Sequence, residues 1–296
     1  MSSDLVLQYL FAGLTYGVLY AIIAIGFNII YNTTGIINFA QGEFVMLGGM
    51  TAVSLSSLLP LPLAIAAAVL ITMVIGALVE LCFIRWLVRP SVLRMIIITI
   101  GLSIIIREAA LHVWGESIRA LPYFTGNEIS TVQLGPVKVS PQVLWVLGVC
   151  SFVVLGLTVF FSSTSLGREM RACSANRTAA ELCGIDSRNL VTFSFMLSAG
   201  IGALAGCVIS PITSIHYEIG PGLAIKGFTV AILGGLGNSL AAVGGGLVLG
   251  MIEAFSVSFV PLAFQDAISI GVLLAILFLR PHGLFGSADA ARLKEF

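Results

Sequence analysis

Long apolar segments, each about as long as a bilayer is thick, follow one another along most of this chain. A helix that spans the hydrocarbon core of a bilayer needs roughly 20 apolar residues, because each residue adds about 1.5 Å toward a thickness of about 30 Å. Eight segments are candidates: residues 5–31, 39–59, 62–84, 92–114, 141–161, 189–209, 240–260 and 264–279. The sequence therefore predicts an all-α polytopic membrane protein, a single domain over residues 1–296 with eight full transmembrane helices.

A ninth apolar piece, residues 224–236, is too short to span a bilayer on its own. As a helix it would rise only about 20 Å, so we expect a short or broken membrane segment. The composition agrees with the membrane class, because 9% of residues are charged and 58% are hydrophobic, against roughly 25% charged in soluble proteins. The net charge is zero, which gives no electrostatic argument for binding nucleic acid.

Lysines and arginines predict the orientation, since short cytoplasmic loops carry the excess of these residues. With an external amino terminus, one group of basic residues falls on the cytoplasmic side: Arg85, Arg89, Arg94, Arg168, Arg171, Arg177, Arg188, Arg280, Arg292 and Lys294. Arg119, Lys138 and Lys226 fall on the other side. A cytoplasmic carboxyl terminus, with the tail 280–296, then requires an odd number of crossings, so the short piece 224–236 must cross as well.

Two long loops are predicted, one on each side of the membrane. The external loop, residues 115–140, contains an alternating stretch, 132–139, with a Gly-Pro turn that suggests a small hairpin. The cytoplasmic loop, residues 163–189, is the longest polar interval of the chain. Its composition favours a short amphipathic helix that ends at Gly184, and this helix is either a plain connector or a docking element for a soluble partner.

Two interruptions of the apolar pattern by glycine and uncharged polar residues, residues 32–43 and 234–239, predict a pathway through the membrane. The first contains Asn38, Gln41, Gly42 and Glu43, and the second contains Gly234, Gly235, Gly237 and Asn238. Asn38 and Gln41 have the spacing of a capping box that begins a helix, with Glu43 about one turn inside. Irregular backbone at membrane depth is tolerated beside protein or water, so these breaks mark either a transport pathway or ordinary tight turns.

Glu253 falls near the middle of the segment 240–260, so we expect it to face other helices or a cavity. Three GxxxG pairs, at Gly13 and Gly17, Gly202 and Gly206, and Gly246 and Gly250, predict close helix packing. The chain has no HExxH and no GxxxxGK[ST] motif, and its cysteines have no zinc spacing. We therefore expect no enzyme, no metal site and no ATP site on this chain.

Three stretches together carry a family resemblance: GIINFAQGE at 35–43, GREMRACSANRTAAELCGI at 167–185 and FTVAILGGLGNSLAAVGGGLVLG at 228–250. They resemble the Liv-type permeases of bacterial ABC importers for branched-chain amino acids, specifically the H-type subunit. In that family the cytoplasmic loop couples the permease to the ATPase. The resemblance assigns this coupling role to Gly167, Arg168, Arg171, Ala172, Asn176, Ala179, Gly184 and Ile185.

The resemblance also implies partners and location: a second Liv-type permease in a hetero- or homodimer, two ATPase subunits that bind ATP and Mg, and an external solute-binding protein. The chain would lie in the bacterial inner membrane and carry branched-chain or other hydrophobic amino acids. Relatives for urea or short amides leave the substrate open. An ion-coupled carrier or channel, with Glu43, Glu253 and Asp266 as its ion sites, is the alternative class.

Overall fold

The computed structural model describes residues 3–86, 92–127, 129–134, 137–261, 264–280 and 283–284, and this part of the chain is almost entirely helical. The first half contains α1 (Ser3–Thr34), α2 (Gln41–Leu55), α3 (Leu61–Val79), the π-helical turn η1 (Glu80–Ile84), α4 (Val92–Trp114), β1 (Val132–Leu134) and β2 (Val137–Val139). The second half contains α5 (Pro141–Ser163), α6 (Ser165–Ala175), α7 (Arg177–Leu182), α8 (Ser187–Thr213), α9 (Ile219–Gly234), α10 (Ser239–Ser256) and α11 (Gln265–Leu279).

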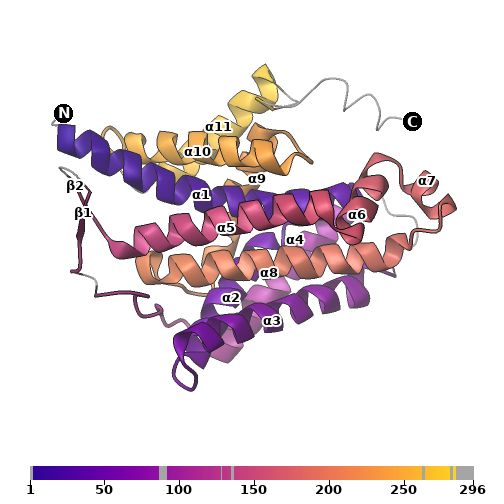
Figure 1. Cartoon of the computed structure of the whole chain (residues 1–296), viewed down its shortest axis with the longest axis horizontal. Coiled ribbons are helices and arrows are strands. Elements are labelled where there is room, and N and C mark those ends of the chain that lie inside the picture. The colour runs from indigo at the N-terminus through magenta and orange to yellow at the C-terminus, as the bar shows by residue number, and fades with distance from the viewer. Residues whose placement is uncertain are drawn as a thin grey trace.

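The long helices run roughly parallel or antiparallel to one another, so the molecule has two distinct ends (Figure 1). The start of α1 and the β1–β2 hairpin lie at one end, and α6 and α7 lie at the opposite end (Figure 1). In the hairpin Val132 pairs with Val139 and Leu134 with Val137, which confirms the predicted strands. The β1–β2 hairpin and the helices α6 and α7 lie at opposite ends, which agrees with the sequence prediction that the two long loops lie on different sides of a membrane.

The prediction of eight full spans is not confirmed, because six helices of the described residues are long and apolar enough to cross a membrane. Two predicted spans are shorter than the apolar runs that contain them. The helix α2 has 15 residues and ends where Ser56 and Ser57 turn their hydroxyls onto preceding carbonyls. The helix α11 also has 15 residues, so each rises only about 22 Å. The short piece expected near 224–236 is the 16-residue helix α9.

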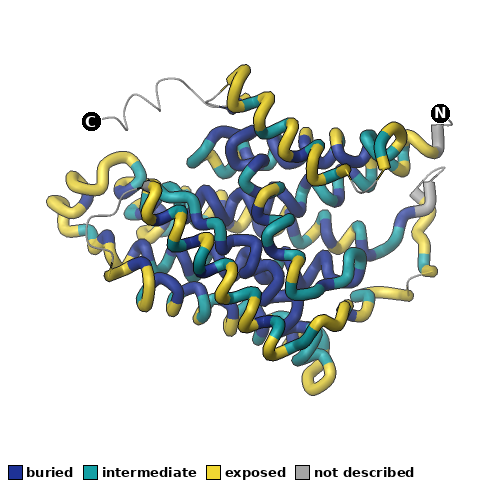
Figure 2. The backbone as a smooth tube through the Cα atoms, turned by 180° about the vertical axis from the view of Figure 1, so that it is seen from behind, coloured by how far each residue is buried: buried dark blue, intermediate teal, exposed yellow. Residues whose placement is uncertain are grey.

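The centre of the bundle is formed by α1, α2 and α8. The most apolar window of α8 is 78% buried and that of α4 only 17% buried, so α4 lies at the periphery. Figure 2 shows the same division, with buried backbone in the middle and exposed faces on the outer helices. The exposed faces of α3, α4 and α5 are lined by leucine, isoleucine and phenylalanine side chains. Such faces are stable where lipid covers them.

Two of the predicted GxxxG pairs meet each other, and together they join α1 to α10. A Cβ atom placed on Gly250 would lie 2.4 Å from the carbonyl oxygen of Gly13, and one on Gly246 would lie 2.4 Å from that of Gly17. Each glycine therefore lets the opposite backbone approach to contact distance. The third pair brings α8 onto α2, since a Cβ on Gly206 would lie 2.0 Å from the oxygen of Val45.

Candidate functional site

The polar loop 163–189 folds as two short helices, α6 and α7, and not as the single helix that the sequence predicted. Asn176 separates them, because its side-chain oxygen accepts a hydrogen bond of 3.0 Å from the backbone N–H of Ala179 and thereby begins α7. Thr164 begins α6 in the same way, accepting from Gly167 at 3.0 Å. Asparagine favours such a capping position over a helix interior, which explains the break.

The predicted stop at Gly184 is confirmed, and its geometry is that of a Schellman motif. Gly184 has φ +87°, in the left-handed region that glycine adopts without strain. The N–H of Ile185 donates to the oxygen of Ala180 at 3.1 Å, and that of Gly184 donates to Glu181 at 3.0 Å. These bonds satisfy the last carbonyls of α7 and turn the chain toward α8.

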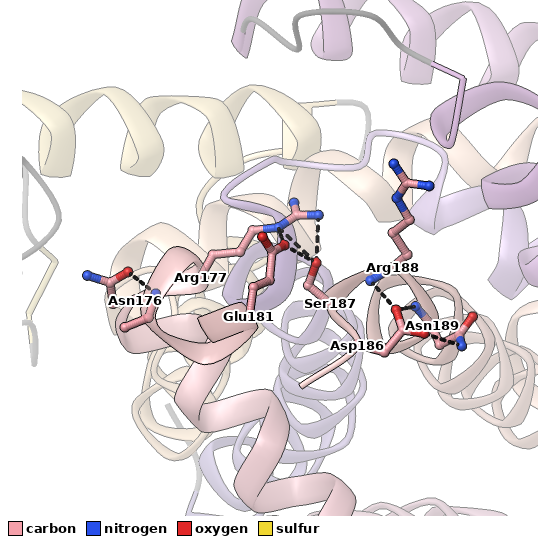
Figure 3. A network of polar contacts seen from close by, with 8 residues as sticks. Asn176, Arg177, Glu181, Asp186, Ser187, Arg188 and Asn189 are labelled. Atoms are coloured by element: carbon pink, nitrogen blue, oxygen red, sulfur yellow. Dashed lines mark hydrogen bonds and ion pairs between the residues drawn. The ribbon is translucent and has the colours of Figure 1, made fainter. Parts of the chain in front are cut away.

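A network of polar side chains ties α7 to the start of α8 (Figure 3). Arg177 forms an ion pair of 3.2 Å with Glu181 and donates to the hydroxyl of Ser187 at 3.1 Å, and Ser187 in turn donates to Glu181. The hydrogen bond from Ser187 and the guanidinium of Arg177 hold the pKa of Glu181 below its ordinary value. The carboxylate is therefore ionised at neutral pH, where it retains both partners.

Asp186 caps α8 by accepting from the N–H groups of Arg188 at 3.1 Å and Asn189 at 3.2 Å (Figure 3). Neither Asp186 nor Ser187 was among the predicted coupling residues. A capping signal was present in the sequence, since an aspartate stands directly before the helical segment.

Most of the predicted coupling residues form the outer surface of α6 and α7. Six of them are exposed: Arg168, Arg171, Ala172, Asn176, Ala179 and Gly184. Ile185 is half-buried, and Gly167 is buried where α6 leaves α5, since its Cβ would lie 2.4 Å from the oxygen of Phe160. Leu182, which sequence reasoning missed, is 86% exposed at the end of α7. Exposed arginines and an exposed leucine therefore lie on the same two short helices, α6 and α7.

The first pathway break lies in the buried centre of the bundle. Here the predicted capping box is wrong: α2 begins at Gln41, its N-cap is Ala40, and the oxygen of Asn38 accepts from the N–H of Ala40 at 3.1 Å. The side chain of Gln41 points instead to α8, accepting from the Ser198 hydroxyl at 2.6 Å and donating to the Ser198 carbonyl at 3.2 Å. Tertiary contacts therefore replace the local cap.

Glu43 lies in the first turn of α2, closer to the helix start than the sequence suggested. It is 1% exposed, and one of its oxygens accepts from the Ser103 hydroxyl of α4 at 2.7 Å. Its other oxygen faces the backbone of α9, because a Cβ on Gly220 would lie 2.3 Å from it. Gly42 contacts the same turn, since its Cβ would lie 2.0 Å from the Gly220 oxygen. Both residues therefore fix the start of α2 against α9.

The second pathway break is a tight turn between α9 and α10. Gly235 and Gly237 have φ of +102° and +90°, and Asn238 begins α10 by accepting from Ala241 at 3.1 Å. Gly234 packs on α10, where its Cβ would lie 2.7 Å from Ala241 and Ala242. Of the two interpretations that the sequence left open, a transport pathway or an ordinary tight turn, the tight turn describes the local structure here.

The turn is attached to α1 by two asparagines: Asn28, which sequence reasoning missed, and Asn32, where the first predicted interruption of the apolar pattern begins. The N–H of Gly237 donates to the side-chain oxygen of Asn28 at 3.0 Å, and the side-chain amide of Asn32 donates to the carbonyl of Gly237 at 2.9 Å. Their spacing of four residues in an apolar helix was a signal of a shared polar face. The first break contacts the same part of α1, because the Ser198 hydroxyl that binds Gln41 also lies 2.8 Å from the carbonyl oxygen of Gly26 and shares its single hydrogen between the two acceptors.

Glu253 does not join these two breaks but lies in a separate cluster between α1, α9, α10 and α11. As predicted, it is buried and faces other helices and a cavity. It accepts from the Tyr20 hydroxyl at 2.7 Å and from Ser269, and it pairs with Lys226 at 3.4 Å. Lys226 also pairs with Asp266 at 3.2 Å. The sequence had placed Lys226 with the external loop charges, whereas the structure places it inside α9.

Two cavities adjoin these clusters. The first, of about 550 Å³, is lined by Tyr20, Lys226, Glu253 and Asp266. The second, of about 580 Å³, lies between α6 and the α9–α10 turn and is lined by Arg171, Asn32, Gly237 and Asn238. It therefore brings the coupling loop next to the second break. Within the described residues, no group of three or more histidine, cysteine or acidic side chains could hold a metal ion.

Comparison with known proteins gives consistent matches over nearly the whole chain. A relative named high-affinity branched-chain amino acid transport system permease protein BraD, from Pseudomonas aeruginosa, is 33% identical over 97% of this chain and 98% of its own. LivH from Salmonella typhimurium is 31% identical over 97% of both chains. A probable LivH from Methanocaldococcus jannaschii is 28% identical over 95% of this chain and 92% of its own.

The fold also has a counterpart among solved structures. A chain of PsaBC from Streptococcus pneumoniae in complex with Fab superposes with a TM-score of 0.51 and 13% identity, covering 93% of each chain. The family model described as branched-chain amino acid transport system / permease component matches residues 9–277. With its six long apolar helices, this chain is an integral membrane protein that belongs to the family of branched-chain amino acid transport permease components.

Proposed function

We propose that this chain is the membrane-spanning permease subunit of an ATP-driven importer for branched-chain or other hydrophobic amino acids. The observation that carries this proposal is the surface of α6 and α7, which extends beyond the long helices and is held by caps at Thr164, Asn176 and Asp186. The same two helices carry the exposed side chains of Arg168, Arg171 and Leu182. The relatives, whose names describe branched-chain amino acid transport permeases, support the substrate class.

The proposed assembly contains two ATPase subunits that bind ATP and Mg, a second permease and an external solute-binding protein. The ATPase subunits dock on α6 and α7. The amino terminus is external and the carboxyl terminus cytoplasmic in a bacterial inner membrane, because the arginines of α6 and α7 belong on the cytoplasmic side. The chain then crosses nine times, with α2, α9 and α11 as short crossings beside the six long helices.

Docking is tested by comparing two exposed leucines at opposite ends of the molecule. Leu182 in α7 is 86% exposed, and Leu58 in the α2–α3 connection is 80% exposed. Leu182→Ser should reduce co-purification of the ATPase subunits with the permease, whereas Leu58→Ser should leave it unchanged. If both variants co-purify as much ATPase as the wild-type permease does, α7 is not part of the ATPase interface.

Transport is tested in vesicles that contain the permease pair with and without the ATPase subunits. We expect leucine uptake that requires ATP, the binding protein and the ATPase, and that excess urea does not inhibit. Uptake driven by a proton gradient without any ATPase would establish the ion-coupled carrier instead. ATP-driven uptake of urea or short amides, with no leucine uptake, would establish the amide permease.

A further inference from the structure

The cavity between α1, α9, α10 and α11 has the charges and shape of a small-molecule site. It has a volume of about 550 Å³, within the usual range of about 300–1,000 Å³ for ligand pockets. One wall carries Lys226 between two carboxylates, those of Glu253 and Asp266. Most of the remaining lining is apolar or aromatic, from Tyr16, Leu19, Ile209, Ile219, Leu223 and Val257, and the polar residues Thr213, His216, Glu218 and Gln265 complete it. An ion-paired cluster beside mostly apolar walls suits a ligand with a polar head and an apolar side chain.

We propose that this cavity binds a zwitterionic α-amino acid with an apolar side chain, whose carboxylate pairs with Lys226 and whose ammonium pairs with Asp266. The proposal rests on the importer function proposed above and adds a recognition site on the permease itself.

Glu253 is a fixed member of the cluster and not a binding group. It is 3% exposed, and it accepts from Tyr20 and Ser269 and pairs with Lys226. A buried carboxylate with three such partners is costly to separate from any of them. It therefore holds the ammonium of Lys226 at the cavity wall, where the Tyr20 ring also lies 5.5 Å from it.

Asp266 is the exchangeable member. Its side chain is 73% exposed, and that of Lys226 is 12% exposed. An ion pair with one exposed partner contributes little to stability, so water or a ligand can separate it at low cost. Lys226 keeps its bond to Glu253 when Asp266 leaves, because the two carboxylates approach it independently at 3.4 Å and 3.2 Å.

A zwitterion can enter this pair without changing the charge of the site. Its carboxylate replaces that of Asp266 on Lys226, and its ammonium replaces that of Lys226 on Asp266, so two ion pairs form where one was broken. A ligand with only one of these groups leaves one protein charge without its partner. The apolar lining then receives the side chain, so leucine, isoleucine and valine fit better than polar amino acids.

The test uses calorimetric binding to the full permease complex in lipid nanodiscs without ATP. The three probes are leucine, 4-methylpentanoate, which lacks the ammonium, and 3-methylbutylamine, which lacks the carboxylate. Asp266→Asn should weaken the binding of leucine and of 3-methylbutylamine roughly tenfold or more, and should leave the affinity for 4-methylpentanoate unchanged. Lys226→Gln should show the reverse preference between the two half-ligands. Glu108→Gln, an exposed acid of α4 outside the cavity, is the control for the loss of one charge and should change none of the affinities.

A purely structural role for the cluster makes a different prediction. The double variant Lys226→Gln, Asp266→Asn removes one charge of each sign. If the cluster is only structural, this variant would either retain the leucine affinity, or lose affinity for all three probes and no longer unfold cooperatively on heating. Either result, or unchanged leucine affinity in Asp266→Asn, would overturn the proposal. ATP-driven leucine uptake, measured with the same protein variants reconstituted in sealed vesicles, separates the two proposals: if wild-type uptake persists while the variants bind normally, only this site is wrong.

Discussion

Gly184 offers the sharpest test of the coupling surface, because substitution there acts on the backbone alone. Its φ of +87° lies where an L-residue is strained, yet nothing lies within 4 Å of the position that a Cβ would occupy. The valine side chain in Gly184→Val therefore meets no neighbour. The substitution destabilises the turn because valine must adopt the left-handed conformation, which costs about 1–2 kcal/mol, and more for a β-branched residue.

Relief of this strain by a change of backbone conformation costs a similar free energy. If valine returns to a right-handed conformation, the bonds from Gly184 to Glu181 and from Ile185 to Ala180 are lost, each with a net value of about 0.5–1.5 kcal/mol. Either way the native end of α7 becomes less populated by a factor on the order of 10, since 1.4 kcal/mol corresponds to tenfold. The network at Ser187 that joins α7 to α8 then loses its fixed geometry.

The assay is stimulation of ATPase activity by loaded binding protein in the reconstituted complex. Gly184→Val should lower stimulation by roughly tenfold and leave membrane insertion intact. Gly184→Asn should retain most of it, because asparagine tolerates the left-handed region. Gly148→Val is the matched control, since Gly148 is exposed, has open space around it and lies inside α5. Unchanged stimulation in Gly184→Val, or an equal loss in Gly148→Val, would refute the reasoning.

Three further predictions test the membrane core and the topology. Glu43→Gln should lower uptake by about fivefold or less, because glutamine has the same size and can still accept the hydrogen bond from Ser103. Glu43→Leu should nearly abolish uptake, and uptake assays with and without a proton gradient should agree for both variants. Gly250→Leu should lower the thermal unfolding temperature and the yield of folded protein, since α10 must move away from Gly13 of α1 at a cost of about 1–3 kcal/mol or more. An impermeant thiol reagent should modify the exposed Cys183 in inside-out vesicles and not in intact cells, and Cys173, which is buried, should react more slowly; labelling of Cys183 in intact cells would reverse the topology.

Several predictions from sequence concern features that neighbouring residues determine. The stop at Gly184, the hairpin at 132–139 and the polar loop between two apolar segments all appear in the structure. The packing of GxxxG pairs was also predicted, because a missing side chain permits close approach wherever a second helix arrives. The sequence did not predict which helix packs against each pair. The structure shows that Gly13 and Gly17 of α1 contact Gly246 and Gly250 of α10.

Errors arose where a distant residue competes with a local signal. Asn38 and Gln41 have capping-box spacing, but Ser198 binds the Gln41 side chain and the helix begins later. The apolar run 39–59 contains enough hydrophobic residues for a span, but hydropathy does not record where a helix starts and ends. Only the caps and turns of the folded chain make α2 a 15-residue helix.

The sequence by itself determined the membrane class, the position of the polar loop and the family, because hydrophobic length and local backbone preference are properties of contiguous residues. The tertiary structure alone decided which polar groups meet. Lys226, Glu253 and Asp266 come from three helices, and Asn28 reaches Gly237 across more than 200 residues of chain. Such pairs depend on which faces of the helices pack together, and no local preference encodes that choice.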